Sequence, residues 1–171
     1  MNTLKMAVAA VVLVTLGACT NADRFGPGGA DAAGGFGANG GIAGSASDPA
    51  SPAFFNETIG DRVLFAVDQS TLSPEAQAVL DQQAVWLMQN VDYRALIEGH
   101  ADEQGTTDYN LALGARRASA VQNYLISRGV APNRLQTISY GKERPIQICS
   151  DETCYSQNRR SVTVITAGAG V

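Results

Sequence analysis

The sequence has few of the residues on which catalytic and nucleic-acid-binding sites depend. Among its 171 residues there is one histidine, His100, and 12 Lys and Arg stand against 16 Asp and Glu, for a formal net charge of -4. Binding nucleic acid irrespective of sequence requires an excess of cationic side chains, so the composition argues against this class. His100 is the only candidate general base near neutral pH, and no serine stands in a nucleophile-elbow motif. We therefore expect no enzyme and no nucleic-acid partner.

The N-terminal apolar run is too short to cross a bilayer. It extends from Met6 to Leu16 behind Lys5, whereas a spanning helix needs roughly 20 apolar residues, and such a run is typical of a secretory signal. The residues that follow end in Gly17-Ala18-Cys19 and resemble the bacterial lipobox, in which the cysteine receives lipid and the signal is cut before it. We predict a lipoprotein signal peptide over residues 1–18, with a generic signal peptide as the alternative.

Lipidation would make Cys19 a membrane anchor. Three acyl chains hold a protein firmly at a membrane, because a single chain binds only marginally. The sorting rules of bacterial lipoproteins imply the outer membrane here, since residue 20 is Thr and not Asp. The rest of the chain is then expected to face the periplasm.

Gly, Ala, Ser, Asp and Pro dominate the segment from residue 19 to residue 53. Such a composition cannot bury enough apolar surface to offset the entropy of ordering, so we predict a flexible tether there. A coil of this length has a root-mean-square span of roughly 30 Å. The expected organisation is therefore a signal over 1–18, a lipidated tether over 19–53 and one domain over 54–171.

Strand-like and helix-like segments alternate in this domain. Short apolar runs predict strands over 62–67, 94–100, 135–141 and 161–166, and 3.6-residue periodicity predicts helices over 73–90 and 108–127. Ser73 and Pro74 form a helix start, and Gly129 ends the second helix. This alternation predicts an α/β fold, an α+β sandwich whose mixed sheet is covered by helices on one side.

The second helix should carry two arginines on different faces. At 100° per residue, Arg116 points away from the expected apolar stripe, whereas Arg117 lies about 85° to one side of it, on the same flank as Asn110. The residues of that expected buried stripe are Leu111, Ala118, Val121 and Leu125.

An acidic residue precedes this helix. Asp102 follows the strand over 94–100, at the end of an α/β sheet where ligands tend to bind. Asp102 and Arg117 could therefore frame a cleft for a zwitterion, whose ammonium needs an acceptor and whose carboxylate suits a guanidinium fork. The alternative is that the two side chains only pair with each other.

Three motifs extend this pattern: "EGHADEQGTTDYNLALGARRASAVQNYL", "SYGKERP" and "NRRSV". Together they resemble the OmpA-like peptidoglycan-binding domain family, over about Phe55 to Ala167. The resemblance implies a βαβαβ domain in which the loop Asp and the helix Arg bind the diaminopimelate of the peptidoglycan stem peptide, here Asp102 and Arg117.

The same resemblance implies three supporting residues. Asp68 is expected to wall the cleft, although Val67 stands where the family has a bulkier residue. Asn110 is expected to fix the loop or contact the ligand, with a plain helix-start role as the alternative. Arg160 is expected to line the rim, with a surface position at a strand start as the alternative.

The lipobox, tether and domain together resemble the lipid-anchored branch of this family, which belongs to the Tol-Pal system. The resemblance implies non-covalent tethering of the outer membrane to the cell wall, a role in envelope integrity and cell division, and TolB, with TolA as a second candidate, as partners. The alternatives are a purely structural envelope lipoprotein outside that system and, less favoured, a peptidoglycan hydrolase.

Two cysteines remain, Cys149 and Cys154 in "CSDETC". An oxidising periplasm favours a disulfide between them, with free thiols or a metal site as alternatives. No Cys or His neighbour completes a tetrahedral metal set, and the spacing of His100, Asp102, Glu103 and Asp108 fits neither an EF-hand nor a zincin. We expect neither a metal nor another cofactor.

Overall fold

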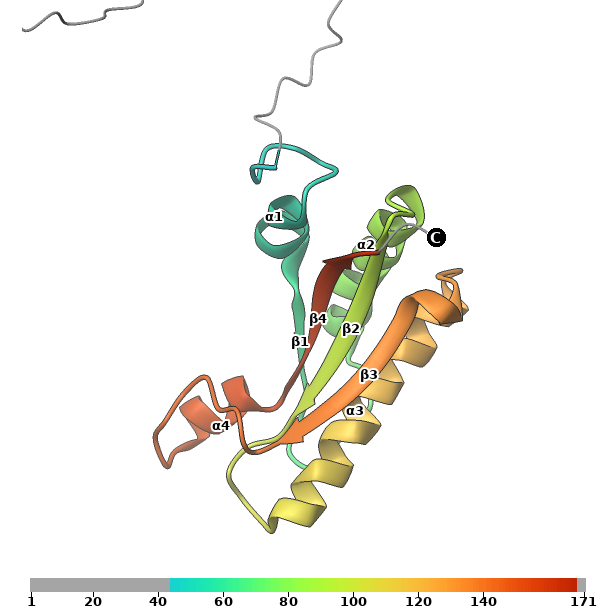
Figure 1. Ribbon diagram of the computed structural model, residues 1–171. Coiled ribbons are helices and arrows are strands. Elements are labelled where there is room, and N and C mark those ends of the chain that lie inside the picture. Colours follow the sequence, from blue (N-terminus) through green and yellow to red (C-terminus); the bar gives the residue numbers. More distant parts are fainter. Residues whose placement is uncertain (1–43, 169–171) are drawn as a thin grey trace, which may run out of the picture. The chain divides into compact units, whose positions relative to one another are not determined.

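The computed structural model describes residues 44–168, which form a four-stranded sheet with two long helices against it (Figure 1). The signal peptide, Cys19 and most of the predicted tether lie outside the described residues. The elements in chain order are α1 (Pro52–Phe54), the π-helix η2 (Phe55–Gly60), β1 (Arg62–Leu64), α2 (Pro74–Gln89), β2 (Tyr93–His100), α3 (Thr107–Ser127), the 3-10 helix η3 (Pro132–Arg134), β3 (Leu135–Gly141), α4 (Glu152–Asn158) and β4 (Arg160–Ala167).

The sheet is mixed, with the strand order β1-β4-β2-β3. Strand β2 pairs in parallel with β3 and antiparallel with β4, which also pairs antiparallel with β1. Helices α2 and α3 pack on the same face, where Ala95 and Ile97 of β2 join the hydrophobic core. The predicted mixed sheet with helices on one side is confirmed. Among residues 44–168, no helix has the length and apolar character needed to span a bilayer.

Helix α2 begins as the sequence predicts. The Ser73 side chain accepts a hydrogen bond from the amide of Ala76, and Pro74 occupies the first turn. These residues satisfy the start of the helix, because proline has no N–H to leave unpaired there. The predicted apolar face is buried and comprises Ala76, Leu80, Ala84 and Leu87.

Strand β1 is shorter than the predicted segment 62–67. Pairing with β4 ends where Leu64 faces Arg160, the first residue of β4. Beyond that point the amide of Phe65 still bonds to the Arg159 carbonyl, but the chain then turns. The apolar segment 62–67 therefore includes the buried Phe65 without forming a strand at that residue. The length of β1 is set by where its partner strand β4 begins.

The buried face of α3 contains Ala118, Val121 and Leu125, as predicted, but not Leu111. Leu111 is 47% exposed, whereas Arg117 is completely buried. The helix approaches β2 most closely at Gly114, since a Cβ on Gly99 would lie 1.8 Å from the Gly114 carbonyl oxygen. The smallest residue, and not the leucine, therefore marks the centre of this face, and Arg117 lies one turn from it.

The domain begins before the predicted boundary at residue 54. Ser51 is buried and caps α1, and the indole N–H of Trp86 donates to the Pro49 carbonyl at 2.7 Å. Residues 44–53 were predicted as part of the tether, but the end of this stretch packs against α2. Pro49 and Phe54 also line an apolar groove with Trp86 and its neighbour Val85.

A short helix, α4, was not predicted in the cysteine segment. Its N-cap is Asp151, whose carboxylate accepts from the amides of Thr153 and Cys154. Cys149 and Cys154 form a disulfide, with their Cα atoms 5.8 Å apart. Since each sulfur is bonded to the other, neither is free to bind a metal ion.

Candidate functional site

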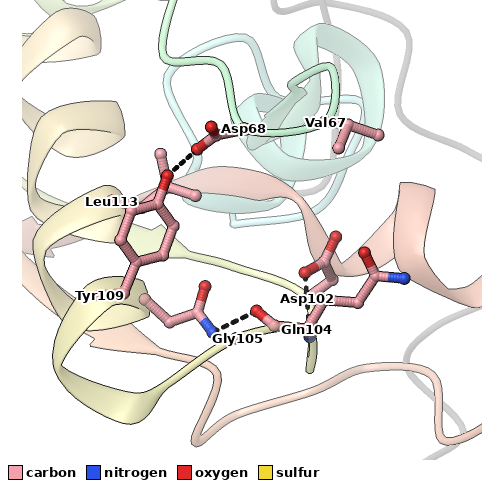
Figure 2. A pocket seen from close by; sticks show the side chains of 8 residues that line it. Val67, Asp68, Asp102, Gln104, Gly105, Tyr109 and Leu113 are labelled. Carbon is pink, nitrogen blue, oxygen red and sulfur yellow. Dashed lines mark hydrogen bonds between the residues drawn. The ribbon is translucent and has the colours of Figure 1, made fainter.

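A pocket of about 320 Å³ opens where the β1–α2 loop, the β2–α3 loop and the first turns of α3 meet. Figure 2 shows the side chains around it, with Asp68 on one side and Asp102 and Gln104 on another. Its wall combines two carboxylates with two carboxamides, a phenol and apolar side chains. The lining residues are Val67, Asp68, Asp102, Gln104, Gly105, Tyr109, Asn110 and Leu113.

Asp102 lies two residues after the end of β2, in the loop where the sequence predicts it, and is 7% exposed. One carboxylate oxygen accepts from the Gln104 amide at 3.2 Å, and the other accepts from Nη1 of Arg159 at 3.1 Å. A carboxylate offers about four acceptor positions, so these two bonds leave capacity for a guest on the pocket side.

Asp68 lies in the β1–α2 loop with a φ of 57°, a conformation that Asp tolerates better than most residues. Its carboxylate accepts a hydrogen bond from the Tyr109 hydroxyl, which ties this loop to the start of α3 (Figure 2). The same hydrogen bond raises the pKa of Tyr109, because it stabilises the neutral phenol. Asp68 therefore lies on the pocket wall where the resemblance predicts it, beside an exposed Val67.

Asn110 is buried at the floor of the pocket. Its side-chain amide donates to the Gln104 carbonyl at 2.7 Å. The sequence left open whether Asn110 fixes the loop, contacts the ligand or only starts the helix. This hydrogen bond fixes the β2–α3 loop.

Arg117 lies beneath the pocket and does not line it. Its guanidinium donates to three backbone carbonyls, those of Gln69 at 2.8 Å, His100 at 2.8 Å and Ala66 at 3.2 Å. Burial lowers its pKa to about 10, while nearby Asp102 acts in the opposite direction. The expectation that Arg117 lies on the helix flank and frames the cleft is wrong: it is a buried cation that joins α3 to the β1–α2 loop and to the end of β2.

The second cation near the pocket was missed in the sequence. Arg159, and not Arg160, contacts Asp102, and it also pairs with Glu152 of α4. The structure does not put Arg160 on the pocket rim: it is buried and donates to the carbonyls of Asn158 and Arg144. Arg159 is the C-cap of α4, whereas Arg160 is the first residue of β4, so a one-residue difference within "NRRSV" decides which arginine reaches the site.

The single histidine is not among the residues that line this pocket. His100 is buried, its Nε2 lies 3.3 Å from Glu98, and its ring lies near Tyr140. Burial lowers its pKa to about 4, with additional lowering from the charges of Arg160 and Arg144. Its backbone carbonyl, which accepts from Arg117, is the part of His100 that serves the site.

Comparison with known proteins identifies the class to which this fold and pocket belong. The OmpA family model matches residues 64–159. The chain is 54% identical over 130 residues to a peptidoglycan-associated lipoprotein of Rhizobium meliloti, covering 76% of this chain and 73% of the relative. It is 45% identical over 164 residues to the peptidoglycan-associated lipoprotein of Agrobacterium fabrum, covering 96% of this chain and 88% of the relative.

Solved structures agree with this fold. The crystal structure of the peptidoglycan-associated lipoprotein from Burkholderia pseudomallei aligns with a TM-score of 0.63 and 38% identity, over 70% of this chain and 97% of that chain. The C-terminal domain of Helicobacter pylori MotB aligns at 0.59 with 22% identity, over 64% and 86% of the two chains, a likeness of fold alone. The chain therefore belongs to the OmpA family and, within it, to the peptidoglycan-associated lipoproteins.

Proposed function

We propose that this chain is an outer-membrane lipoprotein whose domain binds peptidoglycan non-covalently, by holding the diaminopimelate of the stem peptide in the pocket at the end of β2. The observation that carries the proposal is a pocket with two carboxylates, Asp68 and Asp102, close to two buried cations, Arg117 and Arg159. The names of its relatives, which describe peptidoglycan association, support the same reading.

The arrangement suits a zwitterionic guest. An ammonium group would be received by Asp102 and Asp68, since charge-assisted hydrogen bonds contribute roughly 1.5 to 3 kcal/mol each. The guest's carboxylate would lie toward the carboxamides of Gln104 and Asn110, in the positive potential of Arg117 beneath them. Arg117 then acts through its charge and through the β1–α2 loop and the end of β2 that it holds, in place of the direct contact expected from the sequence.

Membrane attachment is the second half of the proposal. Lipid on Cys19 would anchor the chain in the outer membrane, and the residues between the anchor and α1 would let the domain reach the cell wall. Replacing Cys19 by Ser should release the protein into the soluble periplasmic fraction. Retention of that variant with the membranes would refute lipidation at this residue.

The similarity to peptidoglycan-associated lipoproteins also suggests the cellular system in which the chain works. We propose that the chain works in the Tol-Pal system, with TolB and TolA as partners, and contributes to envelope integrity and cell division. Co-purification of TolB with the full chain from crosslinked cells tests this part, and loss of TolB from the eluate would contradict it.

The binding proposal is tested by capture on sacculi. Sacculi that contain diaminopimelate should sediment the purified domain, whereas sacculi with lysine in that position should retain far less, because lysine lacks the second carboxylate. Equal capture by both would contradict recognition of the zwitterionic end. Release of soluble fragments from the sacculi would instead favour a hydrolase.

A further inference from the structure

The disulfide-closed segment contacts both acidic residues of the β2–α3 loop. Glu103, the neighbour of Asp102, accepts hydrogen bonds from the hydroxyls of Ser150 and Tyr155, each at 3.0 Å. Asp102 itself is bound by Arg159, which directly follows α4. One side of the pocket is therefore held by residues 150–159, a segment that does not line the pocket.

The link to Asp102 passes through a shared guanidinium. Nη1 of Arg159 lies 3.1 Å from Asp102 and 3.3 Å from Glu152, and Nη2 also pairs with Glu152. The side chain of Glu152 is 67% exposed, whereas those of the other two are almost completely buried. The guanidinium of Arg159 is therefore shared between two carboxylates. Because Glu152 takes part of this interaction, Asp102 keeps more of its negative charge available to a guest.

This arrangement depends on the position of a helix that is too short to be stable alone. Helix α4 has 7 residues, and isolated helices of fewer than about 12 are marginal in water. The disulfide fixes its first turn, because Cys154 lies in α4 and Cys149 lies in the loop before it. At the other end of α4, Asn158 bonds to the backbone of Ile146 and Gln147.

We propose that residues 149–159 form a brace, in which the Cys149–Cys154 disulfide and Glu152 keep Arg159 and the β2–α3 loop in place and so position Asp102 for its guest. Opening the disulfide loosens the loop and weakens binding while the sheet and the long helices stay folded. Glu152 and Arg159 are positioning residues in this scheme. The effect on affinity rests on the proposed peptidoglycan binding, but the effect on the loop does not.

A dithiol such as dithiothreitol can open the brace by thiol–disulfide exchange. The protein S–S bond breaks, the two sulfurs take up two electrons and two protons to become thiols, and the dithiol is oxidised to its cyclic disulfide. Cys149, which is only half-buried, offers the sulfur for attack.

Amide hydrogen exchange of the folded domain tests the brace without any ligand. The Gln104 amide donates to Asp102 and reports on the loop, whereas the Ile97 amide lies in β2 between two paired strands and reports on the core. Reduction should accelerate exchange at Gln104 tenfold or more relative to Ile97. Unchanged exchange at Gln104, or an equal increase at both amides, would overturn the proposal.

Binding of a diaminopimelate muropeptide is measured on the same samples. Reduction of the disulfide should weaken the affinity for the muropeptide three- to tenfold, and so should Glu152→Gln in the oxidised protein. The control is Glu143→Gln, at an exposed residue of the loop before α4, which should leave the affinity unchanged. Unaltered affinity in Glu152→Gln would overturn the positioning role of Glu152. Should the untreated chain fail to bind muropeptide, the proposed function fails, while the exchange measurement still decides the brace.

Discussion

An arginine binds backbone carbonyls at each end of β2, and in the part of the chain that the structure describes the pocket lined by carboxylates lies at one of these ends. At the first end, Arg134 donates to the carbonyls of Leu87, Asn90 and Tyr93. At the other end, Arg117 donates to three carbonyls in the same manner. Burial lowers the pKa of both guanidinium groups.

The surroundings of the two arginines differ. Burial lowers the pKa of Arg134, and the charge of Asp92, an exposed residue, acts in the opposite direction. Arg117 lies close to Asp102 and Asp68, which face the pocket. The described residues therefore include two arginines that stabilise the fold by binding backbone carbonyls. The carboxylates near Arg117 distinguish the end of β2 that we assign to peptidoglycan binding.

The largest expected effect comes from Arg117→Ala. It removes a buried cation and leaves three carbonyls without their donor, so the free energy of unfolding should fall by about 4 kcal/mol. Denaturant unfolding measures this loss, and capture on sacculi should disappear with it.

Arg134→Ala is the matched control. It removes a partly exposed arginine with a similar set of carbonyls, so the free energy of unfolding should fall by about 2 kcal/mol. Capture on sacculi should remain at the level of the unaltered chain. Loss of capture in this variant would erase the distinction between the two ends.

Acid should destabilise the domain through His100, the last residue of β2. The pKa of His100 is lowered to about 4, so between its ordinary value of 6.5 and that value the unfolded chain binds a proton that the folded chain excludes. The free energy of unfolding should therefore fall as the pH falls through this window, by about 3 kcal/mol in total. His100→Gln should show a flatter decline in denaturant unfolding at pH 7, 5.5 and 4; an identical decline would contradict the assignment.

A change in the pocket itself should affect binding more than stability. Asp102→Ala removes the acceptor for the guest's ammonium, so affinity for a diaminopimelate muropeptide should fall tenfold or more. Arg116→Ala, at the exposed neighbour of Arg117, should change it less than twofold. Calorimetric titration measures both, and equal losses would contradict the placement of the two faces of α3.

These outcomes also mark how far the sequence predicts the molecule. The helix starts and the mixed sheet follow from local patterns, such as the Ser73 cap, that tertiary packing does not alter. The position of Asp102 followed from its place after a strand. The face of α3 followed only in part. Leu111 and Arg117 were misplaced, because the predicted face was centred on large apolar residues while the closest approach to β2 is at Gly114.

The role of Arg159 could not be predicted for a different reason. Its contact with Asp102 spans 57 residues and depends on how α4 is held by the disulfide. No periodic pattern reports such a contact. The doublet of arginines in "NRRSV" was the available signal, and its two members differ in where α4 ends and β4 begins.

The smallest effect is expected at the pocket wall. Tyr109→Phe removes the hydroxyl that donates to Asp68 but keeps the ring, so muropeptide affinity should change only two- to threefold. Calorimetric titration measures this change, and a loss as large as that of Asp102→Ala would make Tyr109 a principal contact of the guest.

The most direct test is a nuclear magnetic resonance titration of the isotope-labelled chain with a diaminopimelate muropeptide. We predict shifts concentrated at the amides of Asp68, Gln104 and Asn110, with the indole N–H of Trp86, in the apolar groove beside α1, unchanged. Shifts centred on Trp86, or the same shifts from a muropeptide with lysine in place of diaminopimelate, would contradict the account.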